Sequence, residues 1–111
     1  MTCENLFTGI PPQLSEEVVT VLCRDKGIRI ERIVSEGQRS PDDFWYDQKR
    51  HEWVVVLEGR AAIEFEGKPE LVELERGSYL HIPAHTRHRV ASTSATEKTV
   101  WLAILYADAT G

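Results

Sequence analysis

The chain has 111 residues, of which 41% are hydrophobic and 28% are charged, and its formal net charge at pH 7 is -5. This length suits a single folding unit, and the composition is that of a globular protein rather than a disordered chain. No apolar run approaches the roughly 20 residues of a transmembrane helix, and no dense cluster of Lys or Arg is present. Nucleic acid and membrane are therefore not expected as partners.

The N-terminus lacks the basic start and apolar stretch of a secretory signal, so we expect a cytoplasmic protein. Cys3 and Cys23 do not have the spacing of metal ligands, and we expect both to be reduced. Residues 1–15, which include Pro11-Pro12, are interpreted as an N-terminal extension. Residues 16–106 then form the barrel of one domain that occupies residues 1–111.

The first predicted element is a hairpin. Two β-branched runs, residues 18–23 and 28–34, flank Asp25-Lys26-Gly27, whose glycine suits a left-handed turn position. The polar residues 35–43, with Gly37 and Pro41, are predicted to form a loop.

The next predicted strand, residues 52–57, is apolar at five consecutive positions, which is typical of a central strand covered on both faces. We expect a second subunit to provide the outer cover, in a homodimer formed by sheet packing on sheet. Gly59 permits a chain reversal into residues 61–66, where apolar and polar side chains alternate. One face of that strand is expected to be buried and the other to be solvated.

Four further strands are predicted at residues 71–74, 79–82, 87–91 and 99–106, with a Ser- and Thr-rich loop at 92–98. The acidic positions along residues 64–75 are assigned to a solvated surface. Roughly eight short strands without helix periodicity indicate an all-β sandwich or barrel.

Two segments resemble the signature motifs of the cupin superfamily. In the second motif, Gly77 is followed after five residues by Pro83 and five positions later by His88, while His85 stands where the family usually has glycine. In the first motif, Glu52 precedes Gly59 with six residues between them, but the family's paired histidines are absent. The resemblance extends from about Gly37 to Val90, and it implies a jelly-roll barrel, the double-stranded β-helix of cupins.

In that family the first-motif positions and the second-motif histidine usually hold a divalent metal. The resemblance aligns the missing histidines with Tyr46 and Gln48, or with Trp45 and Asp47. Side chains at even separation in a strand share a face, so Tyr46, Gln48 and Glu52 are expected on one face and Asp47 and His51 on the other.

We therefore predict that Gln48, Glu52 and His88 line the pocket and ligate manganese, iron, nickel or zinc. Tyr46 is a pocket residue that would hydrogen-bond a substrate. A bulge that turns Asp47 and His51 inward is an alternative arrangement, and His85 is a further candidate ligand.

Three functions follow from this interpretation. The first is a metal-dependent protein that binds or transforms a small polar molecule, by oxygenation, isomerisation or proton abstraction, with nothing in the sequence to choose among these reactions or to settle whether the chain is an enzyme. The second is a metal-free binding or sensing module. The third is a structural dimer whose pocket has no ligand.

Overall fold

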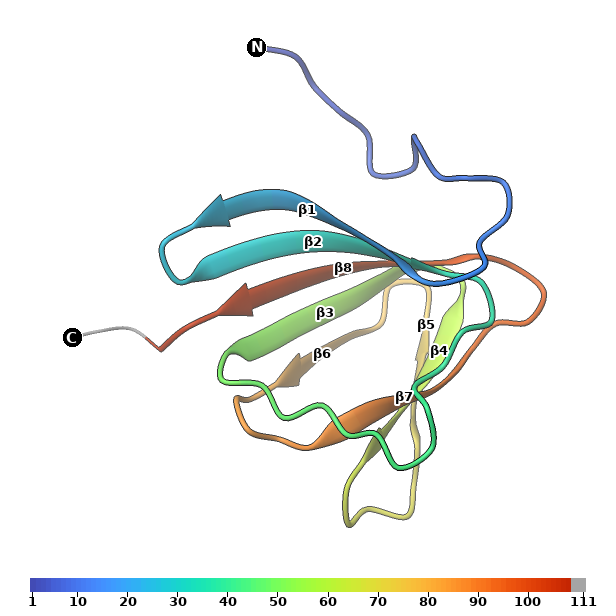
Figure 1. Cartoon of the computed structure of the whole chain (residues 1–111), viewed down its shortest axis with the longest axis vertical. Helices are drawn as coiled ribbons and strands as arrows, with labels where there is room; N and C mark the ends of the chain where they lie inside the picture. The colour runs from blue at the N-terminus through green and yellow to red at the C-terminus, as the bar shows by residue number, and fades with distance from the viewer. Residues whose placement is uncertain (109–111) are drawn as a thin grey trace.

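A computed structural model describes residues 1–108 as eight antiparallel strands, with no helix among them (Figure 1). The strands are β1 (Val18–Asp25), β2 (Ile28–Ser35), β3 (His51–Glu58), β4 (Arg60–Phe65), β5 (Val72–Glu75), β6 (Tyr79–Ile82), β7 (His88–Thr93) and β8 (Thr99–Tyr106). All eight predicted strands are present, and the ends of most differ from the prediction by one or two residues. A helix long and apolar enough to cross a membrane does not occur within these residues.

The strands form two sheets that face each other (Figure 1). One sheet has five strands in the order β1-β2-β8-β3-β6, and the other has three in the order β5-β4-β7. The strand predicted to be central, β3, lies one position from the edge, and β8 occupies the middle of the large sheet. The inward side chains of the apolar run in β3 pack in the core, and Trp53 on the outer face lies against the ring of Tyr79 of β6.

The core lies between the sheets and follows the expected two-residue alternation. Val54 and Val56 of β3 point inward, as do Trp101 and Ala103 of β8, and all four are at most 4% exposed. In β4, Ala61 and Ile63 both belong to the core, so the predicted alternation holds there. The register shift opposite Ala62 and Ile63 leaves Ala91 of β7 as an extra residue. Ala62 is nevertheless buried, whereas the sequence predicted it on the solvated face.

Gly59 makes the tight connection between β3 and β4. Its φ is +88°, and a Cβ atom there would lie 2.6 Å from the Cα of Thr99, so only glycine fits without a shift of the backbone. This confirms the predicted reversal. The connection holds β3 in the large sheet and β4 in the small one, and so defines one end of the space between the sheets.

The segment between β2 and β3 passes beside β7 (Figure 1). The amide of Tyr46 donates to the carbonyl of His88 at 2.7 Å, and the amide of His85 donates to the carbonyl of Gln48 at 2.8 Å. The amide of His88 also donates to the carbonyl of Tyr46 at 3.2 Å, and the two bonds between Tyr46 and His88 form an antiparallel bridge. Arg89 anchors the same segment, because its guanidinium donates to the carbonyl of Ser40 and lies against Glu64.

The N-terminal residues cross above the β1 and β2 edge of the large sheet (Figure 1). Arg32 of β2 donates to the carbonyls of Leu6 and Thr8, at 3.0 and 2.7 Å. This segment therefore packs on its own chain through a buried guanidinium. Cys3 and Cys23 are both free and exposed.

Candidate functional site

A cavity of about 280 Å³ lies between the two sheets, lined by seven polar and eight apolar side chains. The polar side chains come from the segment before β1, from β2, from the segment before β3, from β3 and from β7. They are Glu17, Arg29, Glu31, Tyr46, Gln48, Glu52 and His88. The apolar lining consists of Val19, Ile33, Val54, Ile63, Ile82, Val90, Trp101 and Leu105. Such a cavity, apolar with a few convergent polar groups, is typical of a small-molecule site.

Glu52 and His88 meet inside this cavity. The Oε1 atom of Glu52 lies 3.9 Å from the Nε2 atom of His88, and their side chains are 14% and 6% exposed. The Nδ1 atom of His88 is 2.8 Å from the carbonyl of Thr86, which can only accept a hydrogen bond. Nδ1 therefore carries the proton, and the lone pair of Nε2 faces Glu52.

Burial changes the proton affinity of both groups. It raises the pKa of Glu52 to about 7, and the nearby carboxylate of Glu31 adds to this increase. It also lowers the pKa of His88 below its ordinary value, against the opposing effect of the hydrogen bond to Thr86. Near neutral pH, Glu52 is thus present in both protonation states while the imidazole is neutral. A carboxyl and an imidazole in this condition can give and take a proton at the same position.

Tyr46 and Gln48 complete the polar wall near this pair. The ring of Tyr46 stacks on that of His88 with centroids 5.4 Å apart, and the backbone bridge between them fixes this contact. Burial raises the pKa of the Tyr46 phenol, and the carboxylates of Glu17 and Glu52 raise it further, so Tyr46 stays a neutral hydroxyl. The structure therefore brings Tyr46, Gln48, Glu52 and His88 to one cavity.

Three polar lining residues were not predicted from the sequence: Glu17, Arg29 and Glu31. The Nε atom of Arg29 lies 3.2 Å from a carboxylate oxygen of Glu31. The carboxylate of Glu17 accepts a hydrogen bond of 2.8 Å from the buried hydroxyl of Ser35. Alternation along residues 28–34 places Arg29 and Glu31 on one face, but it does not say which face turns inward. That depends on the pairing of β2 with β8.

The other candidate residues lie outside the cavity. His51 is on the opposite face of β3, where its Nδ1 accepts from the amide of Ala84 at 2.9 Å and its Nε2 pairs with Asp108. The exposed side chains of Asp47 and His85 pair with each other at 2.9 Å. His85 has a φ of +61°, the left-handed conformation that glycine would adopt more readily at this family position.

The donor set of the cavity was compared with the needs of a metal ion. Within residues 1–108, no group of three His, Cys, Asp or Glu side chains is arranged to hold a metal. A carboxylate such as that of Glu52 and an imidazole such as that of His88 are common metal ligands. The hydrogen bond from Nδ1 of His88 to the carbonyl of Thr86 orients the Nε2 lone pair, as in many metal sites. A site with three protein ligands would therefore need the amide oxygen of Gln48 as its third donor.

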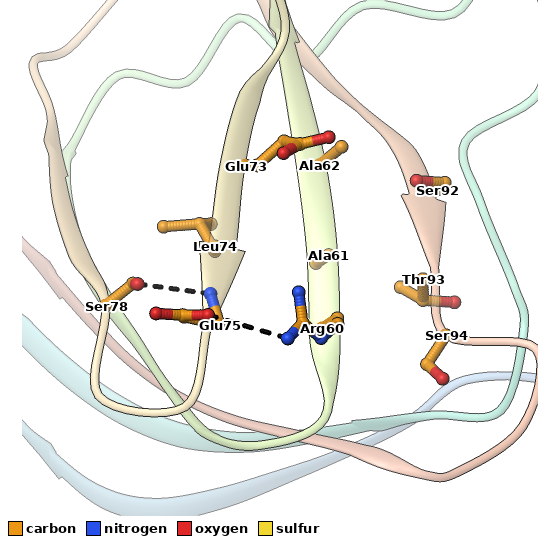
Figure 2. A pocket seen from close by; sticks show the side chains of 10 residues that line it. All are labelled: Arg60, Ala61, Ala62, Glu73, Leu74, Glu75, Ser78, Ser92, Thr93 and Ser94. Atoms are coloured by element: carbon orange, nitrogen blue, oxygen red, sulfur yellow. Dashed lines mark hydrogen bonds and ion pairs between the residues drawn. The ribbon is translucent and has the colours of Figure 1, made fainter.

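A second hollow, of about 380 Å³, lies on the small sheet (Figure 2). Two of its charged residues form an ion pair: Arg60 and Glu75 are 3.6 Å apart across β4 and β5, and both are largely exposed. The backbone amide of Glu75 donates a hydrogen bond of 3.1 Å to the hydroxyl oxygen of Ser78. Glu73 and Glu75 are exposed, as the sequence predicted. The paired and solvated charges make this hollow a poor candidate for a reactive site.

Comparisons with known proteins agree with this architecture. The family model described as "Cupin domain" matches residues 32–105. A solved structure from Ralstonia eutropha JMP134, named "putative mannose-6-phosphate isomerase", is 45% identical, with a TM-score of 0.93. That alignment covers 97% of this chain and 100% of the Ralstonia chain. No match was found among curated proteins.

More distant structures share the fold alone. An RmlC-like cupin protein from Desulfovibrio desulfuricans is 22% identical, with a TM-score of 0.71 and coverage of 95% of this chain and 96% of that one. The structure named "FeII HppE" is 19% identical, with a TM-score of 0.70, over 88% of this chain and 54% of that one. These similarities confirm the predicted all-β jelly roll of the cupin type.

Proposed function

The chain belongs to the cupin family, and from this premise we propose that its inner cavity binds a small polar molecule and that Glu52 and His88 move a proton on it. The observation that carries the proposal is their convergence, with Nε2 of His88 3.9 Å from Oε1 of Glu52 in a largely apolar cavity. One group is a carboxyl and the other an imidazole. Burial raises the pKa of Glu52 to about 7 and lowers that of His88, so the imidazole is neutral.

Proton abstraction next to a carbonyl is the reaction that this pair suits best. The neutral Nε2 atom can accept a proton from a carbon of the ligand, and protonated Glu52 can donate one to a developing oxygen anion. Tyr46 has a neutral hydroxyl that can hydrogen-bond a ligand oxygen, and Gln48 offers an amide. His88 would then return its proton to the neighbouring carbon, while the Glu52 carboxylate takes the proton of the adjacent hydroxyl, which completes an isomerisation of a hydroxy-aldehyde to a hydroxy-ketone and restores both groups. The Ralstonia relative is named as an isomerase, which supports this reaction class.

Deuterium exchange tests the proposal without knowledge of the product. The protein is incubated in D2O with a panel of hydroxy-aldehydes and hydroxy-ketones, each offered with and without a phosphate group, and loss of carbon-bound protons is followed by NMR. We expect exchange above the protein-free rate for at least one compound, and loss of that exchange in His88→Asn and Glu52→Gln. Background exchange with every compound would contradict the proposal.

Divalent metal binding is a second candidate, supported by the oriented lone pair of His88 beside the Glu52 carboxylate. Gln48, Glu52 and His88 would be the ligands, and a metal held there would supply Lewis-acid polarisation of a ligand oxygen. Metal analysis of untagged protein tests it, with His88→Ala as the comparison. Stoichiometric metal in the native chain that is lost in the variant would support this candidate. If the native chain from several expression media contains no metal, the cavity acts as a metal-free binding site.

We also propose that two copies associate through the outer face of the large sheet. Trp53 and Val55 of β3 lie on this face, and the ring of Trp53 is 5.6 Å from that of Tyr79, which is 68% exposed. Light scattering during size-exclusion chromatography should give the mass of a dimer for the native chain and of a monomer for Trp53→Glu. Leu71→Glu, at an exposed apolar residue outside this face, is the matched control. A monomeric native chain at all concentrations would contradict this.

A further inference from the structure

The charges around the cavity are unevenly distributed. Three carboxyl groups line it, those of Glu17, Glu31 and Glu52, against one guanidinium, that of Arg29. Arg29 already lies 3.2 Å from Glu31, so its charge is compensated before any ligand enters. The Nδ1 atom of the His88 imidazole is hydrogen-bonded to the carbonyl of Thr86, so its N–H does not point into the cavity.

Each carboxyl group is held in place by its surroundings. The buried hydroxyl of Ser35 donates to Glu17 at 2.8 Å and lies 3.3 Å from the indole nitrogen of Trp101, which also lines the cavity. Glu31 is 12% exposed and Glu52 14% exposed, so neither can turn fully into water. The positions of these carboxyl groups are therefore fixed by β2, β3 and the segment before β1.

Groups that normally bind a phosphate are absent from this wall. Proteins hold phosphate with Arg or Lys side chains, with helix N-termini or with clusters of backbone amides. Residues 1–108 contain no helix, and Arg29 is the only Arg or Lys among the described residues that line the cavity. A phosphate would thus enter a cavity that holds three carboxyl groups and one guanidinium, and that guanidinium already forms an ion pair with Glu31.

We propose that the cavity selects for ligands without negative charge, so that its substrate is an uncharged, unphosphorylated hydroxy-carbonyl compound. This inference rests on the function proposed above and specifies its substrate class. Apolar walls formed by eight side chains suit the carbon skeleton of such a compound, while Tyr46 and Gln48 can hydrogen-bond its hydroxyl groups. Repulsion by like charges, which is strong in a poorly hydrated cavity, excludes the phosphorylated form.

Binding of a matched pair of probes, mannose and mannose 6-phosphate, tests the inference by NMR titration of the isotopically labelled protein. We expect mannose to bind at least about tenfold more tightly than its phosphate ester, in line with the cost of like-charge contact. Glu31→Gln removes one carboxylate and releases Arg29, so it should reduce the ratio of the two affinities about tenfold. Glu75→Gln, in the exposed ion pair with Arg60, is the matched control and should change neither affinity.

A second measurement keeps the inference testable if neither sugar binds. Two nitroxide probes of similar size, one anionic and one cationic, are added separately, and paramagnetic relaxation of the amides around the cavity is compared. The inference predicts weaker relaxation by the anionic probe, and a smaller difference in Glu31→Gln.

The outcomes separate the two proposals. Binding of mannose 6-phosphate as tight as that of mannose, or stronger relaxation by the anionic nitroxide, overturns the inference on charge and leaves proton transfer standing. If the anionic nitroxide is excluded, the inference on charge is supported. If no compound shows deuterium exchange in the same protein, the proposed reaction is ruled out.

Discussion

His51 and Glu52 are neighbours in the chain, yet they lie on opposite faces of β3 and in contrasting environments. Both ring nitrogens of His51 have partners, the amide of Ala84 and the carboxylate of Asp108. The carboxyl group of Glu52 has no hydrogen bond to any of the described residues, and it faces His88 across 3.9 Å. The outer group is hydrogen-bonded within the fold, whereas the inner group keeps its polar atoms free toward a cavity. This difference distinguishes a stabilising contact from a reactive one.

The largest expected effect is loss of proton transfer on replacement of His88. His88→Asn keeps the backbone bridge to Tyr46 but removes the basic Nε2 atom. The deuterium-exchange rate with a responsive ligand should fall by about 10²–10⁴-fold, the usual contribution of a general base. Dispersed NMR spectra of the variant establish that it folds. A folded variant that keeps the native exchange rate would show that His88 is not the base.

Replacement of Glu52 should change stability in a pH-dependent way. Its pKa in the folded protein, about 7, lies above the ordinary value of 4.5, so the folded state binds the proton more tightly than the unfolded chain. The protein therefore loses up to about 3 kcal/mol as pH rises from about 4.5 to 7, and the penalty persists above that. Glu52→Gln removes the titrating group.

Urea unfolding of the native chain and of Glu52→Gln measures this difference. The variant should gain up to about 3 kcal/mol relative to the native chain between pH 4.5 and pH 8. A relative stability that stays constant over this range would mean that Glu52 titrates normally.

On the outer face the expected effect is smaller. The hydroxyl of Tyr106 lies 2.7 Å from Nε2 of His81, and both rings are near His51. Tyr106→Phe removes one hydrogen bond at the surface and should cost about 1 kcal/mol or less in thermal or urea unfolding. Exchange activity should remain within about twofold of the native rate. A tenfold loss of activity would connect the outer face with the reaction.

The smallest effect is expected at His85. Its exposed imidazole pairs with Asp47, and its φ of +61° is one that Asn tolerates better than most residues. His85→Asn should change unfolding free energy by no more than about 0.5 kcal/mol and leave exchange activity unchanged. It makes the same substitution as His88→Asn at an outer histidine. Equal losses of activity in the two variants would remove the distinction between the inner and outer groups.

Much of this arrangement could be predicted from the sequence, because turn residues and two-residue alternation are local signals. They located all eight strands and placed Glu52 and Val54 on the same face. Gln48 also faces the cavity as predicted, but for another reason: residues 47–50 are outside any strand, and the amide of His85 fixes the backbone at Gln48. Spacing alone could not have supplied that contact.

Local sequence signals could not predict that β8 is the middle strand or that Arg29 and Glu31 face the cavity. Whether β8 or β3 is central depends on which strands pair, and pairing is a long-range property of the fold. The same pairing decides which face of β2 turns inward. The charge balance of the cavity, on which the substrate class depends, is therefore visible only once the sheets are assembled.

The central claim is that Glu52 and His88 share the inner cavity as a proton-transferring pair. NMR titration of the ligand-free protein with ¹³C-labelled Glu carboxyl groups tests it most directly, with Glu52→Gln to assign the signal. The account predicts that one carboxyl carbon titrates near pH 7 and that its signal is missing from the variant. If every glutamate titrates between about pH 4 and 5, as ordinary glutamates do, the claim is contradicted.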